Sequence, residues 1–291
     1  MTLRTHSPQA TDWLVPDWPL PPGVHALCTT RAGGVSLPPY DSLNLGTHVG
    51  DDPAAVRANR LRLQSALEGV TAGTRPVFLS QVHGDGVVQL DGGTPNGIEA
   101  DACVAAVPAV ACTIMVADCL PVLFAHRSGR AVAAAHAGWR GLAGVDGQGV
   151  LESVFKRFVA LAQADQARDA IKIEAILPLQ GVAQDTLAWL GPCIGPQAFE
   201  VGPEVRAAFC DTAPALQDCF APSGHASGKY LCDLAGLARR RLQALGITHV
   251  HGNDGTPPWC TVTNASRFFS HRRDSAALGG SGRFAACIWR G

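Results

Sequence analysis

Residues 102–137 read ACVAAVPAVACTIMVADCLPVLFAHRSGRAVAAAHA, and this stretch decides the fold. Its first part, 102–117, is apolar except for one proline and one threonine. A membrane-spanning helix needs about 20 apolar residues, so this run is too short to cross a bilayer. We interpret it as two buried strands with a turn at Pro108. The apolar runs 121–125 and 131–136 follow directly and predict two more buried strands.

Short apolar runs outside this stretch predict further strands, bounded by turn residues. They lie at 24–30, 77–81, 171–175, 247–250 and 284–289.

Three segments repeat apolar residues at helical spacing and therefore predict amphipathic helices. Asp52 followed by Pro53 is a typical helix start, and Gly246 is a typical residue just after a helix end. The three segments are 53–67, 151–161 and 234–245, the last of which starts after Asp233.

The order of these elements is irregular, which favours mixed sheets with helices outside them over a regular alternation of strands and helices. No proline-rich or glycine-rich linker divides the chain, so we expect residues 1–291 to form one domain. The segment 163–186 has no clear period, and we interpret it as an excursion between a helix and the next strand.

Composition limits the classes of partner. The 291 residues carry 23 Lys and Arg against 24 Asp and Glu, a net charge of −1. Such a chain has no general attraction to nucleic acid or anionic lipid, so we expect neither partner. Hydrophobic residues reach 47% and charged residues only 16%, which excludes disorder. The low charge is consistent with a surface covered in a homo-oligomer, or simply with an alanine-rich composition.

Ten cysteines are spread along the chain without a C-x-x-C pair. This spacing excludes a zinc ribbon and a thioredoxin-type motif. Residues 1–23 lack the pattern of a signal peptide, so we expect a cytoplasmic protein whose thiols are mostly reduced and buried.

Three motifs place a metal-binding residue type where a strand gives way to a turn: SQVHG at 80–84, ADCLP at 117–121 and HAGWRG at 136–141. One cysteine and two histidines are three ligands, and a three-ligand zinc site keeps a fourth position for water or substrate. The separations of 36 and 17 residues form no local metal motif. A buried Cys119, with His83 and His136 capping turns, remains the alternative.

Two arginines could bind an anion. Arg31 ends the predicted strand 24–30 beside two glycines and could clamp a phosphate, or could belong to an ordinary surface turn. Arg272 lies in FFSHRRD, residues 268–274, where aromatic and basic residues suit stacking and anion binding; a solvated charge run beside core aromatics is the alternative. We interpret Cys193 as structural, and the strand pair His249 and His251 as ordinary histidines.

Taken in order, these pieces resemble the laccase-domain or polyphenol-oxidase (YfiH-like) family over nearly the whole chain. The motifs that carry the resemblance are TTRAGGVSLPPYDSLNLGTHVGDDPAAVRANR, SQVHG, EADACV, ADCLPVLF, HAGWRGLAGV, WLGPCIGPQAFEVGPEV, YLCDLAGLARRRL and FFSHRRD with GRFAACIW. The resemblance implies an α+β fold, a single domain of two packed mixed β-sheets with helices on the outer faces, in α/β/β/α layers.

The resemblance also implies a zinc-dependent purine nucleoside phosphorylase that acts on adenosine, inosine, guanosine and methylthioadenosine and also deaminates adenosine. The family's His, Cys and His metal ligands fall on His83, Cys119 and His136. Residues 143–149 and the excursion at 163–186 look longer than the family's usual connections, which leaves substrate preference open.

Two rival activities use the same three residues. A blue-copper centre usually adds an axial methionine, but Met115 lies four strand positions before Cys119, roughly 13 Å away. A copper cluster also needs several H-x-H pairs, and the chain has one, so we regard copper oxidation as the weaker hypothesis. A cysteine hydrolase with Cys119 as nucleophile and a histidine as base is the second rival, and some relatives look like amidases that edit peptidoglycan precursors.

For the phosphorylase, phosphate would attack the anomeric carbon of the ribose, oriented by Arg31 and Arg272, with Gln81 contacting the substrate. His83, Cys119 and His136 would hold zinc, or copper in the alternative, as the catalytic group. Deamination would use water activated at the metal to attack C6 of the purine. Asp101 and Asp118 are equally open as proton carriers.

Overall fold

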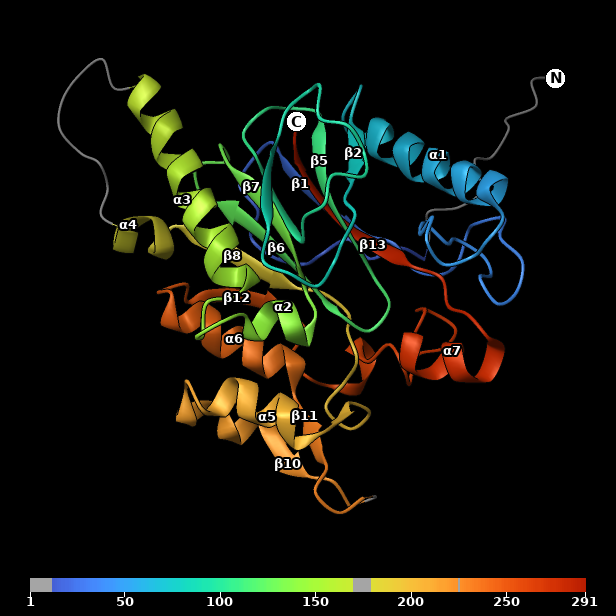
Figure 1. Ribbon diagram of the computed structural model, residues 1–291. Coiled ribbons are helices and arrows are strands. Elements are labelled where there is room, and N and C mark those ends of the chain that lie inside the picture. Colours follow the sequence, from blue (N-terminus) through green and yellow to red (C-terminus); the bar gives the residue numbers. More distant parts are fainter. Residues whose placement is uncertain (1–11, 170–178, 225) are drawn as a thin grey trace.

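Two β-sheets packed face to face form the centre of the molecule (Figure 1). The protein is described here as a computed structural model, which covers residues 12–169, 179–224 and 226–291. The six-stranded sheet has the order β12 (His249–Gly252), β8 (Thr186–Leu190), β6 (Leu120–His126), β7 (Val132–Ala137), β4 (Ala102–Ala105) and β3 (Val87–Leu90). The four-stranded sheet has the order β1 (Val24–Cys28), β13 (Phe284–Arg290), β5 (Val110–Val116) and β2 (Arg75–Phe78).

Helices cover the outer face of each sheet, which completes the expected α/β/β/α layers (Figure 1). The apolar stripes of α3 (Val150–Asp169) and α6 (Leu234–Ala244) pack on the six-stranded sheet through residues such as Phe158 and Leu242. On the other side, Leu63 and Leu67 of α1 (Pro53–Val70) pack on the four-stranded sheet. The remaining helices are α2 (Trp139–Ala143), α4 (Leu179–Gln184), α5 (Pro203–Cys210) and α7 (His271–Leu278).

A third, small sheet was not expected from the sequence. It has the order β10 (Phe220–Pro222), β11 (Tyr230–Cys232) and β9 (Glu200–Val201), and with α5 it forms the lower part of Figure 1. These strands have two or three residues each, too short for an alternating pattern to identify them.

The helix starts follow the sequence signals. The side chain of Asp52 accepts a hydrogen bond from the amide of Ala54, and the side chain of Asp233 accepts one from the amide of Gly236. Each carboxylate satisfies an amide that the first helical turn leaves without a partner. The predicted helices at 53–67, 151–161 and 234–245 are therefore confirmed.

The predicted strands at the core of the fold are also confirmed, with ends shifted by a few residues. β8 was missed, although its five residues are all buried. The segment 163–186 was interpreted as an excursion between a helix and the next strand, but residues 163–169 continue α3 and 179–184 form α4, so both of these parts are helical. The strand predicted at 171–175 lies outside the described residues.

The register of three antiparallel strands brings distant residues together. Ala102 of β4 is paired with Ala135 of β7, and Pro121 of β6 is paired with His136 of β7. The residues just before β4 and β6 therefore reach the same end of the sheet as His136. Within the described ranges, no helix is both long and apolar enough to span a bilayer.

Candidate metal centre

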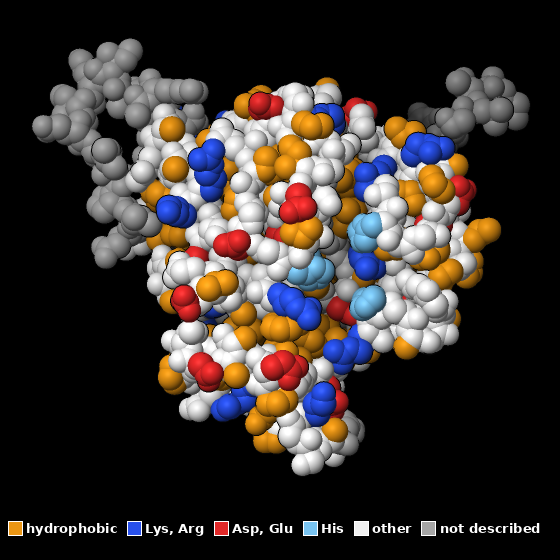
Figure 2. All heavy atoms as spheres, in the orientation of Figure 1, with side chains coloured by type: hydrophobic (Ala, Val, Ile, Leu, Met, Phe, Trp, Pro, Cys, Tyr) orange, Lys and Arg blue, Asp and Glu red, His pale blue; other side chains and the backbone are white. Residues whose placement is uncertain are grey.

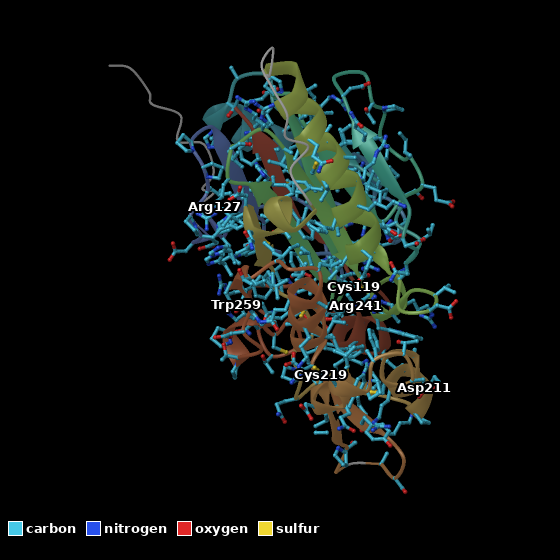
Figure 3. The ribbon with its side chains drawn as sticks, turned by 90° about the vertical axis from the view of Figure 1, so that its left-hand side faces the viewer. Cys119, Arg127, Asp211, Cys219, Arg241 and Trp259 are labelled. Atoms are coloured by element: carbon cyan, nitrogen blue, oxygen red, sulfur yellow. The ribbon has the colours of Figure 1, made fainter. Side chains whose placement is uncertain are left out.

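His83, Cys119 and His136 meet at that end of the six-stranded sheet. Their ligand atoms all lie within 4.8 Å of one another. The Sγ of Cys119 is 3.6 Å from Nε2 of His83, and the two imidazole rings lie edge to face with centroids 4.7 Å apart. Figure 3 shows Cys119 in the middle of the molecule, between the sheets and the part that carries Cys219 and Asp211. The sequence prediction that these three side chains come together is correct.

A buried carboxylate shapes the loop that carries His83. Asp101 precedes β4, is fully buried and accepts hydrogen bonds from the amides of Val82, His83 and Gly84, at 3.2, 2.9 and 2.7 Å. His83 itself has a φ of 62°, in the left-handed region that non-glycine residues seldom adopt. The three hydrogen bonds from the backbone amides to Asp101 hold the loop in this conformation.

The same carboxylate fixes the second histidine. Nδ1 of His136 lies 2.8 Å from Oδ1 of Asp101, and His136 is only 3% exposed. Because Nδ1 is bonded to Asp101, Nε2 is the nitrogen left available to a metal.

Cys119 is presented by a strained turn. Asp118 has a φ of 93°, and its carboxylate accepts hydrogen bonds from the hydroxyl of Thr261 at 2.5 Å and from the amide of Arg272 at 2.7 Å. These bonds tie the turn to the C-terminal part of the chain.

Electrostatics favour a charged thiolate. Burial alone would raise the pKa of the Cys119 thiol, but His136 and His83 outweigh burial and lower that pKa to about 6. Burial alone would lower the pKa of His136, whereas Cys119 and Asp101 raise it to about 9. Without a metal, Cys119 and His136 therefore form a thiolate–imidazolium pair. A thiolate is also the form of cysteine that binds metals.

A cavity of about 420 Å³ opens onto the three residues, within the size range of small-molecule sites. Figure 2 shows histidine and cationic side chains beside apolar atoms in the middle of one face of the molecule. The residues that line the cavity are His48, Gln81, His83, Met115, Val116, Ala117, Asp118, Cys119, His136, Trp139, Arg140, Ile194, Phe199, Leu234, His271, Arg272 and Arg283.

Two of the three predicted substrate-binding residues line this cavity. The side-chain amide of Gln81 exchanges two hydrogen bonds with the backbone of Met115, at 2.8 and 2.9 Å, and keeps one N–H donor. The guanidinium of Arg272 donates to the carbonyl of Glu200, at 3.3 and 3.2 Å, and keeps three donors.

Arg31 does not reach the cavity. Its guanidinium forms an ion pair with Asp41 at 3.1 Å, donates to the carbonyls of Asp41 and Ala265, and stacks over the ring of Phe269. These contacts hold together loops of the four-stranded sheet, so the position gives no support to a role in phosphate binding.

Four further basic residues line the cavity and were given no role from sequence: His48, Arg140, His271 and Arg283. Arg140 and His271 lie in motifs that the sequence had singled out, but neither residue was distinguished from its neighbours there. Burial, with help from Arg283 and Arg60, lowers the pKa of His48 and favours its neutral form. His48 and Arg283 also lie in motifs that carry the family resemblance, but nothing in those motifs assigned either residue to a site, because only the fold brings them to the cavity.

The other cysteines contribute packing. All ten thiols are free, and the nine besides Cys119 are buried. Burial raises the pKa of several of them, among which Cys219 reaches about 11 and Cys287 about 12. Cys119 is therefore the only thiol with both access to the cavity and a lowered pKa.

Residues 143–149, the longer connection noted in the sequence, do not line the cavity. Arg241 of α6 donates to the carbonyls of Ala143 and Gly147 and pairs with Glu152, which fastens this connection to α6.

Comparison with known proteins extends the similarity to the whole chain. Residues 25–291 match the family model described as multi-copper polyphenol oxidoreductase laccase. A Pseudomonas aeruginosa protein named purine nucleoside phosphorylase is 47% identical over 277 residues, 95% of this chain and 98% of that protein. The Escherichia coli purine nucleoside phosphorylase YfiH is 45% identical over 276 residues, with the same coverage.

Solved structures of similar sequence share the fold. A Neisseria meningitidis protein, 43% identical, covers 96% of this chain and 99% of its own, with a TM-score of 0.76. YlmD from Geobacillus stearothermophilus is 29% identical over 97% of both chains, with a TM-score of 0.75. The sequence motifs, the fold and these matches agree, and the chain belongs to the multi-copper polyphenol oxidoreductase laccase family.

Proposed function

We propose that this chain is a zinc-dependent purine nucleoside phosphorylase, which cleaves adenosine, inosine, guanosine and methylthioadenosine to base and sugar 1-phosphate. One observation carries the proposal: a three-ligand His/Cys/His cluster opens into a cavity of nucleoside size whose wall is basic. Relatives named purine nucleoside phosphorylase, 47% and 45% identical over almost their entire lengths, support it.

The donor set of the cluster fits zinc. Two imidazole nitrogens and one thiolate are borderline and soft ligands that zinc prefers, and three protein ligands leave a coordination position for substrate. When bound, zinc supplies Lewis-acid polarisation of a substrate or water oxygen. His83, Cys119 and His136 are the residues that would hold it.

Phosphate is the second substrate, and we assign its binding to Arg272. In phosphorolysis an oxygen of phosphate bonds to C1′ of the ribose while the C1′–N9 bond breaks, and the purine leaves with that electron pair and gains a proton. The three remaining donors of Arg272 suit the bidentate binding that orients phosphate. Arg140 and Arg283 add positive charge to the same cavity.

The nucleoside would lie between apolar and polar walls. Ile194, Phe199 and Leu234 supply apolar surface for the purine, and the remaining N–H of Gln81 supplies a polar contact. Adenosine deamination is proposed as a side activity of the same cavity, in which water adds to C6 and ammonia leaves.

A copper-dependent polyphenol oxidase is the weaker alternative, although the family description names it. The sulfur of Met115 lies 3.8 Å from the guanidinium of Arg60, packed in the core beneath α1. The described part of the chain offers one group of three ligands able to hold a single ion; His48 and His271 line the same cavity but belong to no second group of this kind.

A cysteine hydrolase, such as an amidase that edits peptidoglycan precursors, is the second candidate. The observation that favours it is the cluster of Cys119 with His83 and His136, in which the two imidazoles lower the pKa of the thiol. In that reaction Cys119 would attack the amide carbon and His136 would give its proton to the leaving amine.

We place the reaction in the cytoplasm, because ten free thiols suit a reducing compartment. A homo-oligomer remains an expectation from the low content of charged residues. The extension of one domain over residues 1–291 likewise remains a proposal.

The deciding experiment combines metal analysis of freshly purified protein with release of hypoxanthine from inosine. We expect one zinc per chain, release that requires phosphate, and loss of release on chelation that zinc restores. Hypoxanthine release that does not depend on phosphate, from protein without stoichiometric zinc, contradicts the proposal. Oxidation of phenolic dyes only after copper loading supports the oxidase, and amide cleavage in the presence of a chelator supports the hydrolase.

A further inference from the structure

We propose that Asp101 is the positioning residue of the metal centre: one carboxylate sets the loop that carries His83 and fixes the ring nitrogen with which His136 binds the metal. The inference rests on the metal site of the proposed function and not on the nucleoside reaction. Asp101 does not line the cavity, so it acts through the loop of His83 and through His136.

The carboxylate of Asp101 is saturated with donors. Oδ1 accepts from the amide of His83 at 2.9 Å and from Nδ1 of His136 at 2.8 Å. Oδ2 accepts from the amides of Val82 at 3.2 Å and Gly84 at 2.7 Å. Two acceptor oxygens with two donors each leave no simple position for a proton. Asp101 is therefore unsuited to carry a proton for the reaction, a role that the sequence had left open.

The three hydrogen bonds from backbone amides to Asp101 explain how His83 can be a ligand although its backbone is in the left-handed region. Three successive N–H groups point to one carboxylate only if the chain curls around it, and His83 has a φ of 62° at the centre of this curl. The curl directs the imidazole of His83 towards Cys119, to 3.6 Å from its sulfur. Without the carboxylate, three partly buried hydrogen bonds from backbone amides would be lost.

The bond to His136 selects a tautomer. With Nδ1–H donating to Asp101, Nε2 carries the lone pair that a metal needs. The register of β4 and β7 enforces this bond, because the amide of His136 also donates to the carbonyl of Asp101 at 2.7 Å. Backbone and side chain thus lock the two residues together on neighbouring strands.

The test compares the zinc affinity of Asp101→Asn with that of the wild-type chain by competition with a chromogenic chelator. In the variant an NH2 group replaces one carboxylate oxygen, and it faces two N–H donors that it cannot accept from. We therefore expect zinc to bind about 10–100-fold more weakly. Asp85→Asn is the matched control, since Asp85 is an exposed residue of the same loop and loses the same charge; its affinity should equal the wild type.

The outcomes separate the two proposals. Zinc affinity of Asp101→Asn within twofold of the wild type would overturn the positioning role, whereas a wild-type chain that binds no zinc would overturn the metal site itself. Circular dichroism establishes that each variant is folded. If Asp101→Asn does not fold, nitrogen-15 NMR of the wild type provides the test.

Nitrogen-15 NMR of the zinc-loaded wild type reports the protonation of each histidine nitrogen without any substitution. We expect the proton of His136 on Nδ1 and slow exchange of that proton with water, because the group is buried. A proton on Nε2 would contradict the inference, even if the protein is fully active.

Discussion

Gly138 lies directly against the imidazole of His83, so closely that the site has no room for a side chain at this position. A Cβ atom on residue 138 would lie 2.7 Å from Cδ2 of His83 and 3.0 Å from the sulfur of Cys119. Real Cβ atoms do not approach carbon to 2.7 Å, and one of the two ligands would have to move.

Gly138→Ala is therefore expected to weaken zinc binding and nucleoside cleavage by about 10–100-fold, the range for a change that misplaces a metal ligand. Chelator competition and the hypoxanthine assay measure the two effects. Gly69→Ala is the control, since a Cβ there meets nothing within 4 Å. Equal zinc affinity in both variants would show that His83 and Cys119 do not bind the metal together.

Cys119→Ala should abolish both zinc binding and nucleoside cleavage, because it removes a ligand outright. We expect activity to fall at least 100-fold, beyond the roughly 10–100-fold loss typical of a residue that only orients a ligand. Cys210→Ala, a buried thiol in α5, serves as the control and should keep its zinc. Retained activity in Cys119→Ala would refute the assignment of the site.

The lowered pKa of Cys119 predicts a pH-dependent reactivity in chelator-treated protein. The thiolate reacts with iodoacetamide, so labelling of Cys119 should be fast at pH 7 and should decrease as the pH falls below about 6, where the thiol is protonated. Mass spectrometry of labelled peptides identifies the site. A midpoint near 8.5, the value of an ordinary thiol, would contradict the charge pairing with His136.

The two arginines named from sequence should behave differently. Arg272→Gln removes charged donors from the cavity and should raise the KM for phosphate about 10–100-fold, besides losing the hydrogen bonds to the carbonyl of Glu200. Arg31→Gln breaks an ion pair and two carbonyl contacts outside the cavity, so it should lower the free energy of unfolding by about 1–3 kcal/mol and leave the KM for phosphate unchanged.

Steady-state kinetics at varied phosphate and urea unfolding separate these effects. If Arg31→Gln raised the KM for phosphate while Arg272→Gln did not, the assignment of phosphate to the cavity wall would be reversed.

Much of the fold could be predicted from local patterns. The layers follow from apolar runs such as 121–125 and from helix signals such as Asp233, and both kinds of signal depend on neighbours in sequence. β8 was not predicted: its apolar run, residues 187–190, is short, and it follows α4 almost directly, so no turn residue marks where the strand begins. The third sheet pairs strands too short to carry a period.

The site was predictable by residue type but not by geometry. His83, Cys119 and His136 stand at strand ends, where a rigid framework presents functional groups. The pairing of Asp101 with His136 depends on strand register, which the sequence alone does not determine. His48 and Arg283 reach the cavity from parts of the chain 235 residues apart, and the motifs that contain them do not show that the two residues meet.

The position of β13 sets the order in which the molecule can be completed on the ribosome. β13 lies between β1 and β5, and among the described residues it is the only strand of the sheet that pairs with β1. More than 250 residues must therefore be synthesised after β1 before its pairing partner β13 exists. Such distant pairing is slow, and a nascent or C-terminally truncated chain leaves the edge of β5 open to aggregation.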